Sequence, residues 1–263
     1  MTRPGAFTEA YGPWAVVAGA SEGLGAAFAE ALARRGCQLI LIARRGELLD
    51  ALATRLRAAH GVEVRTLAVD LAGDDWIAPL QALASELAIG VAVYNAAYSF
   101  VGPLLERSLA DAERVVDVNV EGPLRFAYAL VPAMLARKRG ALVLMSSLAG
   151  FQGSPRLAAY AASKAFITVL AESLWAECRP HGVHVLASCA GAIRTPGYLA
   201  TAKGDAPGTL DPADVAERTL AAIGRGPVVV PGAVNKLARF FLGRLLTRRA
   251  AVGVMAKSTA DLT

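Results

Sequence analysis

The sequence predicts an α/β fold: a doubly wound parallel sheet of about seven strands, with helices on both faces. Short apolar runs that fit buried strands alternate along the chain with longer segments of helical periodicity. The first strand leads directly into a glycine-rich turn and an alanine-rich helix. The chain has 263 residues, 55% of them hydrophobic, and it contains no internal repeat and no linker. We therefore expect a single domain over residues 1–263.

The composition of the chain excludes several kinds of partner and site. The formal net charge is +5, but the excess basic residues are local, so we expect no nucleic-acid partner. No apolar run is long enough to span a membrane and the N-terminus lacks a signal-peptide pattern, so we expect a cytoplasmic protein. Cys37, Cys178 and Cys189 fit buried thiols in a reducing compartment. The histidines form no metal-ligand pattern, so no metal site is expected.

The first predicted strand, residues 14–18, is followed by a turn with the spacing Gly19-x-x-x-Gly23-x-Gly25. A strand, a glycine-rich turn and a helix in this order are the context that a dinucleotide-binding fingerprint needs. Gly19 permits the tight turn, Gly23 lets the backbone approach a pyrophosphate, and Gly25 lets helix and strand pack closely. Glycine also marks ordinary turns, so this feature alone is weak support for nucleotide binding.

The second predicted strand, residues 38–42, ends at Ala43-Arg44-Arg45. An acidic residue that would hold an adenosine ribose 2′-hydroxyl is expected at this place. The planar guanidinium groups of the two arginines suit a 2′-phosphate instead, which favours NADP(H) over NAD(H). The alternative is that both arginines begin a solvated helix over residues 46–60 and point outward.

The next two strands end in polar or small residues. Residues 62–69 alternate like a strand and lead to Asp70-Leu71, where Asp70 could accept a hydrogen bond from an adenine amine. A helix capped by aspartates is expected over residues 74–87. The strand at residues 91–94 gives way to Asn95-Ala96-Ala97, small residues where a cofactor must lie close.

Residues 108–139 read as a long helix with Asn119 in its middle. An asparagine within a helix is mildly unfavourable unless its side chain bonds the backbone or water. A polar residue on a solvated face of the helix explains Asn119 equally well.

The stretch from Ser147 to Lys164 carries the candidate catalytic groups. A buried strand over residues 141–146 places Ser147 at its end, and a helix after Pro155 places Tyr160 and Lys164 one turn apart on one face. An ammonium about 4 Å from a phenol, at an effective dielectric of about 20, favours the phenolate by roughly 4 kcal/mol. We therefore expect Lys164 to lower the pKa of Tyr160 toward the working pH. Tyr-x-x-x-Lys also occurs by chance.

Beyond this helix we expect a strand at residues 182–187, a substrate loop over 191–210, a helix starting at Asp211-Pro212 and a last strand at 227–231. The segment 235–257 has basic residues and no acid, interleaved with apolar side chains. A basic amphipathic helix can lie on a membrane surface, which makes peripheral membrane contact one interpretation. Docking on the chain's own domain or on a neighbouring subunit, beside the substrate pocket, is the simpler interpretation.

These features, in this order, resemble the short-chain dehydrogenase/reductase superfamily over roughly residues 14–231. The glycine turn, the Asn95 turn and the Ala190-Gly191-Ala-Ile193-Arg-Thr195 stretch are similar to family motifs. A family asparagine falls on Asn119, and a family serine, thirteen residues before the tyrosine, falls on Ser147. The "Leu-Ile-Ala-Arg-Arg" strand end and the basic apolar tail look like the branch of hydroxysteroid dehydrogenases and 3-ketoacyl reductases.

The resemblance implies a Rossmann-type fold and an NADP(H)-dependent oxidoreductase that interconverts an apolar ketone and a secondary alcohol. Tyr160 would be the general acid/base, Lys164 would lower its pKa and hold the nicotinamide ribose, Ser147 would orient the substrate oxygen, and Asn119 would hold a water in a proton relay to Lys164. The implied cofactor contacts are Gly19, Ser21, Glu22, Gly23, Leu24, Gly25, Arg44, Arg45, Asp70, Leu71, Asn95, Ala96, Ala97, Tyr160, Lys164, Gly191, Ile193 and Thr195.

The resemblance also implies a homodimer or homotetramer, formed through the two long helices at about 108–138 and 158–180. Glu22 departs from NADPH-preferring relatives, because a carboxylate beside a 2′-phosphate would repel it; Arg44, with Arg45, should outweigh it. The alternative to an enzyme is a catalytically idle protein that senses NADP(H) through partners.

Overall fold

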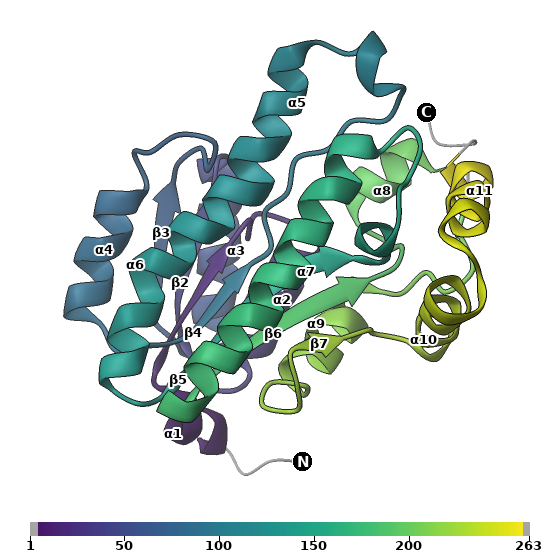
Figure 1. Cartoon of the computed structure of the whole chain (residues 1–263). Coiled ribbons are helices and arrows are strands. Elements are labelled where there is room, and N and C mark those ends of the chain that lie inside the picture. Colours follow the sequence, from purple (N-terminus) through teal and green to yellow (C-terminus); the bar gives the residue numbers. More distant parts are fainter. Residues whose placement is uncertain (1–4, 203, 260–263) are drawn as a thin grey trace.

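The computed structural model describes residues 5–202 and 204–259, and its centre is one parallel sheet. The strand order is β3-β2-β1-β4-β5-β6-β7 (Figure 1). The strands are β1 (Trp14–Ala18), β2 (Gln38–Ala43), β3 (Val64–Ala68), β4 (Ile89–Tyr94), β5 (Gly140–Ser147), β6 (Val183–Ala190) and β7 (Val228–Val229). The predicted doubly wound, seven-stranded fold in a single domain is therefore confirmed.

The helices alternate with the strands and cover both faces of the sheet. The α-helices are α1 (Ala6–Tyr11), α2 (Gly23–Ala33), α3 (Gly46–His60), α4 (Ile77–Glu86), α5 (Leu109–Val116), α6 (Gly122–Ala136), α7 (Ala158–Cys178), α8 (Pro196–Thr201), α9 (Pro212–Leu220), α10 (Ala233–Phe240) and α11 (Arg248–Thr259). Short 3-10 turns are η1 (Leu104–Glu106), η3 (Leu148–Phe151) and η4 (Arg179–His181), and π-helical turns are η2 (Asp117–Glu121) and η5 (Phe241–Leu245).

Two apolar layers hold the helices on the sheet. Alternate strand residues point to opposite faces, as Val17 packs with α2, α3 and α9 while Val16 packs with α4, α6 and α7. The strands are therefore apolar at nearly every position, which is why their sequences show no alternation. Cys37, Cys178 and Cys189 are buried free thiols, as predicted.

The strand order determines where a crevice forms at the edge of the sheet. β1 lies between β2 and β4, so the chain leaves β1 toward one side of the sheet and later returns to the other side. The connections that follow β1 and β4 therefore diverge, and they leave a crevice at the carboxyl ends of these strands. The glycine turn and the Asn95 turn lie at this crevice.

Several predicted helix ends are wrong. No aspartate side chain caps α4, which starts at Ile77, because the Asp74 carboxylate pairs with Arg125 and the Trp76 indole donates to the backbone of Gly73. Pro212 begins α9 as predicted, but the Asp211 side chain pairs with Arg194 and does not cap the helix.

The predicted long helix over 108–139 is present as an unbroken helical run, in which α5 continues through the π-helical turn η2 into α6. The tail over 235–257 is not one helix, because the chain leaves helical geometry at residues 246–247, between η5 and α11. Ala158, the first residue of α7, is exposed. Of the helices that the structure describes, none has the length and apolar character to cross a membrane.

Candidate active site

A cleft of about 840 Å³ opens at the carboxyl ends of the central strands, within the roughly 300–1,000 Å³ that ligand pockets occupy. It brings together residues from the ends of six strands, β1 to β6, and from α7. Predicted site residues that line it are Gly19, Ser21, Glu22, Gly23, Leu24, Arg44, Arg45, Asp70, Leu71, Asn95, Ala96, Ala97, Ser147, Tyr160, Lys164, Gly191, Ile193 and Thr195. Gly25 and Asn119 are not part of the lining.

The glycine turn after β1 has no room for side chains. Gly19 has a φ of 80°, and a Cβ on it would lie 2.6 Å from the Cα of Ala96. The Asn95 Nδ2 donates to the Gly19 carbonyl at 2.9 Å, which ties the turn to the end of β4. A Cβ on Gly25 would lie 1.9 Å from the same carbonyl, so Gly25 serves the packing of α2 and not the lining of the cleft.

The start of α2 fits a pyrophosphate. Gly23 has a φ of 56°, and a Cβ there would lie 3.1 Å from the Cγ2 of Thr195, so a side chain would close the gap between the turn and the opposite loop. No side chain caps the first N–H groups of this 11-residue helix. Free N–H groups and the positive end of the helix dipole favour an anion at this place.

The two arginines after β2 both line the cleft, but their surroundings differ. The Arg45 Nη2 lies 2.6 Å from the Glu22 carboxylate and donates to the Ser21 hydroxyl at 3.1 Å. Arg44 forms no ion pair with any of the described residues and contributes to lowering the pKa of Asp70. Glu22 therefore already balances the charge of Arg45, whereas Arg44 presents an unbalanced charge to the cleft.

Asp70 is held by a residue that the sequence did not indicate. The Arg114 Nη2, from α5, donates to Asp70 at 2.6 Å, and its guanidinium carbon lies 5.5 Å from the centre of the Tyr98 ring. Burial acts to raise the pKa of Asp70, but the hydrogen bonds from Arg114 and from the Ala72 N–H outweigh it and bring the pKa below its ordinary value. Asp70 therefore stays ionised.

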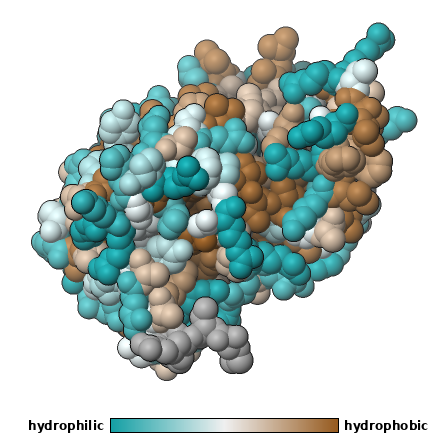
Figure 2. All heavy atoms as spheres, turned by 60° about the horizontal axis from the view of Figure 1, so that its bottom comes forward, coloured by the Kyte–Doolittle hydropathy of each residue, from teal (hydrophilic) through white to brown (hydrophobic). Residues whose placement is uncertain are grey.

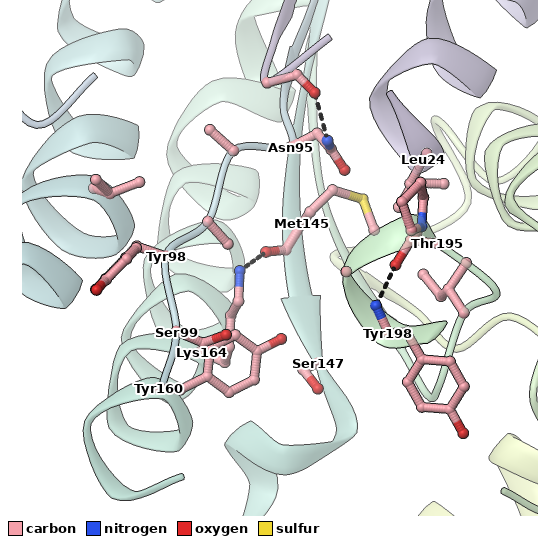
Figure 3. A pocket seen from close by; sticks show the side chains of 18 of the residues that line it. Leu24, Asn95, Tyr98, Ser99, Met145, Ser147, Tyr160, Lys164, Thr195 and Tyr198 are labelled. Atoms are coloured by element: carbon pink, nitrogen blue, oxygen red, sulfur yellow. Dashed lines mark hydrogen bonds between the residues drawn. The ribbon is translucent and has the colours of Figure 1, made fainter. Parts of the chain in front are cut away.

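Lys164 and Tyr160 both project from α7 into the cleft (Figure 3). The Lys164 Nζ donates to the Met145 carbonyl of β5 at 2.8 Å and lies 5.4 Å from the centre of the Tyr160 ring. Burial lowers the pKa of Lys164 to about 8, although the nearby Cys189 thiol acts in the opposite direction. The lysine is therefore in the cleft beside the phenol, as the helical spacing predicted.

The pKa of Tyr160 differs from the prediction. Burial raises the pKa above its ordinary value, and the Ser147 hydroxyl beside it acts to lower it. Lys164 does not supply the predicted net lowering, because its Nζ faces the Met145 carbonyl and the partly buried phenol loses hydration. Figure 3 shows Ser147, at the end of β5, on the same side of the cleft as the Tyr160 hydroxyl. The phenol is therefore protonated at neutral pH.

A buried hydroxyl pair fixes α7 against β5 below these groups. The Ser146 Oγ donates to the Lys164 carbonyl at 2.7 Å and lies 2.7 Å from the Thr168 Oγ1. A Cβ on Gly150 would lie 2.7 Å from the Lys164 carbonyl carbon, so Gly150 lets η3 approach the helix. These residues position Lys164, and no sequence motif pointed to them.

Asn119 lies beneath the cleft, not on a solvated face. Its side chain is fully buried, accepts from the Tyr98 N–H at 2.8 Å, and donates to the Tyr98 carbonyl at 2.9 Å and to Ser163 at 3.0 Å. It is in η2, where the Tyr94 hydroxyl donates to the Val118 carbonyl at 2.7 Å; Gly122 leaves space for that hydroxyl. The amide therefore shapes the segment after β4, and the structure gives no contact between Asn119 and Lys164.

The wall opposite Tyr160 comes from the segment after β6. Ile193 forms a β-bridge with Leu210, and Arg194 binds Asp205 at 2.6 Å and Asp211 at 2.9 Å, so both ends of the loop are tied together. The lining also includes residues that the sequence did not single out, which are Tyr98, Phe100, Val101 and Arg107 after β4 and Leu157 before α7. Tyr198 and Thr201, on α8, also line the cleft and fall within the substrate loop predicted over residues 191–210.

The described residues contain no group of three or more His, Cys, Asp or Glu side chains that could hold a metal ion. The cleft does hold hydroxyl, phenol and ammonium groups from β5 and α7, beside the glycine turn.

Comparison with known proteins agrees with this geometry. A very-long-chain 3-oxoacyl-CoA reductase of Phaeosphaeria nodorum is 36% identical over 69% of this chain and 56% of its own length, so the chain spans about half of that relative. A 7beta-hydroxysteroid dehydrogenase of Clostridium sardiniense is 32% identical over 88% of this chain and 89% of its own. A short-chain dehydrogenase from Sphingobium yanoikuyae, solved in complex with NADPH, superposes with a TM-score of 0.79 at 30% identity, over 95% of this chain and 96% of its own.

The family model described as short chain dehydrogenase matches residues 13–204, which include the glycine turn, Ser147, Tyr160 and Lys164. The matched range is well over half of the 263 residues. This chain therefore belongs to the short-chain dehydrogenase family.

Proposed function

We propose that this protein is an NADP(H)-dependent oxidoreductase that interconverts a ketone and a secondary alcohol, with Tyr160 as its general acid/base. One observation carries the proposal. Tyr160, Ser147 and Lys164 meet in the same cleft as the glycine turn, so that a bound nucleotide and a carbonyl compound could lie beside the phenol. The relatives named as dehydrogenases and reductases support this reaction class.

The residues of the cleft account for the proton transfer. In the reductive direction the Tyr160 phenol, protonated at neutral pH, donates its proton to the ketone oxygen, and the Ser147 hydroxyl donates a hydrogen bond to the same oxygen. The Lys164 ammonium, 5.4 Å from the ring centre, stabilises the phenolate that remains. In the oxidative direction the phenolate takes the proton back. A nicotinamide supplies or accepts the hydride at the carbonyl carbon.

Two observations support NADP(H) over NAD(H). Arg44 presents an unbalanced positive charge to the cleft directly after β2, where a ribose 2′-phosphate would bind. The structural relative from Sphingobium yanoikuyae was solved with NADPH. Gly19, Gly23 and the start of α2 would hold the pyrophosphate, and Lys164 the nicotinamide ribose.

The substrate end of the cleft favours an apolar ketone of the lipid, steroid or acyl type. Tyr98, Phe100, Val101, Leu157 and Tyr198 contribute aromatic and aliphatic surface there. Burial of apolar substrate area against such surface supplies binding energy that does not depend on charge. Relatives named for a steroid and for an acyl-CoA substrate support the same class.

A homodimer or homotetramer remains part of the proposal. Apolar side chains on the outer surface of α5, α6 and α7 are exposed, and an assembly would bury them. They are Leu109, Val116, Leu124, Tyr128, Phe166 and Val169.

The test is a screen of turnover by the purified full chain. NADPH oxidation is followed with steroid ketones, 3-ketoacyl thioesters and small aromatic ketones, NADP reduction is followed with the corresponding alcohols, and both are repeated with NADH and NAD. We expect turnover with apolar ketones and a preference for the phosphorylated nucleotide. Tight NADPH binding without turnover of any compound in either direction would indicate the idle sensor instead.

A further inference from the structure

The C-terminal helices carry an apolar surface that the domain does not cover. Leu237, Phe240, Phe241 and Leu245 on α10 and η5 are 57%, 53%, 48% and 60% exposed. We call these four residues the C-terminal face. On the right of Figure 2, the side that holds α10 and α11 in Figure 1, hydrophobic surface is bordered by hydrophilic residues. Large exposed apolar patches on soluble proteins mark interaction sites.

The opposite side of these helices already serves the fold. The Arg239 guanidinium carbon lies 4.3 Å from the centre of the Phe151 ring, and the Arg248 Nη1 donates to the Phe151 carbonyl at 3.0 Å. The Thr259 hydroxyl donates to the Pro155 carbonyl at 2.9 Å. Because these contacts hold α10 and α11 on the domain, the C-terminal face is left for a partner.

The charged side chains of the tail itself are all basic. Residues 235–257 contain six basic residues and no acid. Lys236, Arg244 and Arg249 among them are exposed. The acids Asp205 and Asp211 of the adjoining loop are both paired with Arg194. The face is therefore a set of half-exposed aromatic and aliphatic side chains within a positive surface.

We propose that the C-terminal face docks on an anionic lipid bilayer. Aromatic and leucine side chains enter the interfacial region of a bilayer, and nearby lysine and arginine are attracted to anionic headgroups. A second copy of the chain fits less well. In a two-fold interface the same patch lies on both subunits, so two sets of like charges would face each other.

The helix that would dock on the bilayer is also connected to the cleft. The Asn235 Nδ2, on α10, donates to the Gly208 carbonyl at 3.1 Å and to the Pro231 carbonyl at 3.0 Å, and a Cβ on Gly191 would lie 2.6 Å from the Asn235 Oδ1. The helix at the membrane is thus joined directly to the loop that forms one wall of the cleft. Bilayer binding itself does not depend on the proposed reaction.

Co-sedimentation of the full chain with phosphatidylcholine vesicles, with and without phosphatidylserine, tests the docking. We expect binding to the anionic vesicles that high salt abolishes. The double variant Arg244→Gln/Arg249→Gln should bind about 25-fold more weakly, since each basic residue at the surface contributes about fivefold. Lys138→Gln, an exposed lysine outside the tail, should bind as the unmodified chain does.

The apolar contribution is tested separately. Phe240→Ser/Phe241→Ser should lower vesicle binding by at least about tenfold, whereas Leu48→Ser, at 40% exposure on α3, should not change it. Leu237→Ser is the milder variant if the double one fails to fold. Failure of the unmodified chain to bind anionic vesicles, or equal binding by all variants, would overturn the proposal. So would a change of sedimentation coefficient in the phenylalanine variant with unaltered vesicle binding, because the face would then join subunits.

Discussion

The two walls of the cleft differ in how far water reaches them. The catalytic wall, formed by Ser147, Tyr160 and Lys164 on β5 and α7, is supported from below by buried hydroxyls, and Lys164 is only 2% exposed. The nucleotide wall, formed by Glu22, Arg44, Arg45 and Asp70, consists of exposed charges, and the Arg45 side chain is 53% exposed. Both walls carry charge, but only the catalytic wall carries it in a dry environment.

This difference determines how much each residue can contribute. In a dry environment the cost of losing hydration is large, so burial governs the pKa values of Tyr160 and Lys164. Exposed ion pairs such as Arg45–Glu22 contribute only about 0–1 kcal/mol and are screened by salt. Substitutions in the catalytic wall should therefore change turnover or stability strongly. Substitutions in the nucleotide wall should change nucleotide affinity only slightly.

The largest expected effect is that of Lys164→Met, which should lower turnover by about a thousandfold and yet stabilise the fold. The folded pKa of Lys164, about 8, lies below the value of 10.5 for an exposed lysine, so the unfolded chain binds more protons between these values. Below pH 8 the buried charge therefore costs up to about 3 kcal/mol of stability. Loss of the hydrogen bond to Met145 offsets about 1 kcal/mol of the gain.

Denaturant unfolding at several pH values measures this gain, with Lys138→Met as a surface control. The net stabilisation of about 2 kcal/mol should be present at neutral pH and should shrink as the pH rises from 8 toward 10.5. Destabilisation of the Lys164 variant at neutral pH would show that burial of this ammonium has no net cost.

The two directions of the reaction should respond differently to pH. Because burial raises the pKa of Tyr160, the phenol is protonated at neutral pH and only its deprotonated form can act as a base. Alcohol oxidation should therefore accelerate with pH above neutrality, by about tenfold per unit in the limiting region. Ketone reduction should be constant across neutrality and decline only in alkali. Profiles of kcat/KM in both directions provide the measurement, and a reduction rate that falls across the neutral range would contradict the assignment.

Substitutions in the nucleotide wall should change the Kd for NADPH by smaller factors. The factor should be larger for Arg44 than for Arg45. Arg44→Ala should raise the Kd for NADPH by about tenfold, as expected for a partly screened contact to phosphate. Arg45→Ala should raise it by only about threefold, because Glu22 already occupies Arg45. Neither variant should alter the Kd for NADH. Fluorescence titration measures these Kd values. A larger increase of the Kd for NADPH in Arg45→Ala than in Arg44→Ala would contradict the roles assigned to the two arginines.

The smallest expected effect is that of Glu22→Gln, which removes the carboxylate and releases Arg45. NADPH should bind about threefold more tightly and NADH as before, since the change acts on the 2′-phosphate alone. Adding Arg45→Ala to this variant should cancel the gain in NADPH affinity. Glu47→Gln, on the first turn of α3, is the matched control and should leave that affinity unchanged. Unchanged NADPH affinity in Glu22→Gln would show that this carboxylate lies too far from the phosphate to matter.

Local features of the site could be predicted from the sequence. The glycine turn follows from backbone geometry that only glycine permits, and helical spacing alone puts Tyr160 and Lys164 on one face. The sheet was predictable for the same reason, because apolar strands separated by helices leave few arrangements. These expectations depend on residues that are close in sequence.

Features that depend on distant contacts were missed. Within the π-helical turn that contains Asn119, the Val118 carbonyl accepts from the Tyr94 hydroxyl, 24 residues earlier in the chain, and no periodicity contains that contact. The partner of Asp70 is Arg114, which is 44 residues away. The pKa of Tyr160 was predicted with the wrong sign, because the charge of Lys164 is visible in the sequence and the depth of burial is not.

The central claim is that the Tyr160 phenol exchanges a proton with the substrate oxygen. Its most direct test is the rate of NADPH oxidation with an apolar ketone in Tyr160→Phe, beside Tyr98→Phe as a second tyrosine of the same cleft. We predict that Tyr160→Phe lowers kcat by about a thousandfold and leaves the Kd for NADPH unchanged, while Tyr98→Phe remains active. Turnover near the unmodified rate in Tyr160→Phe would contradict the claim.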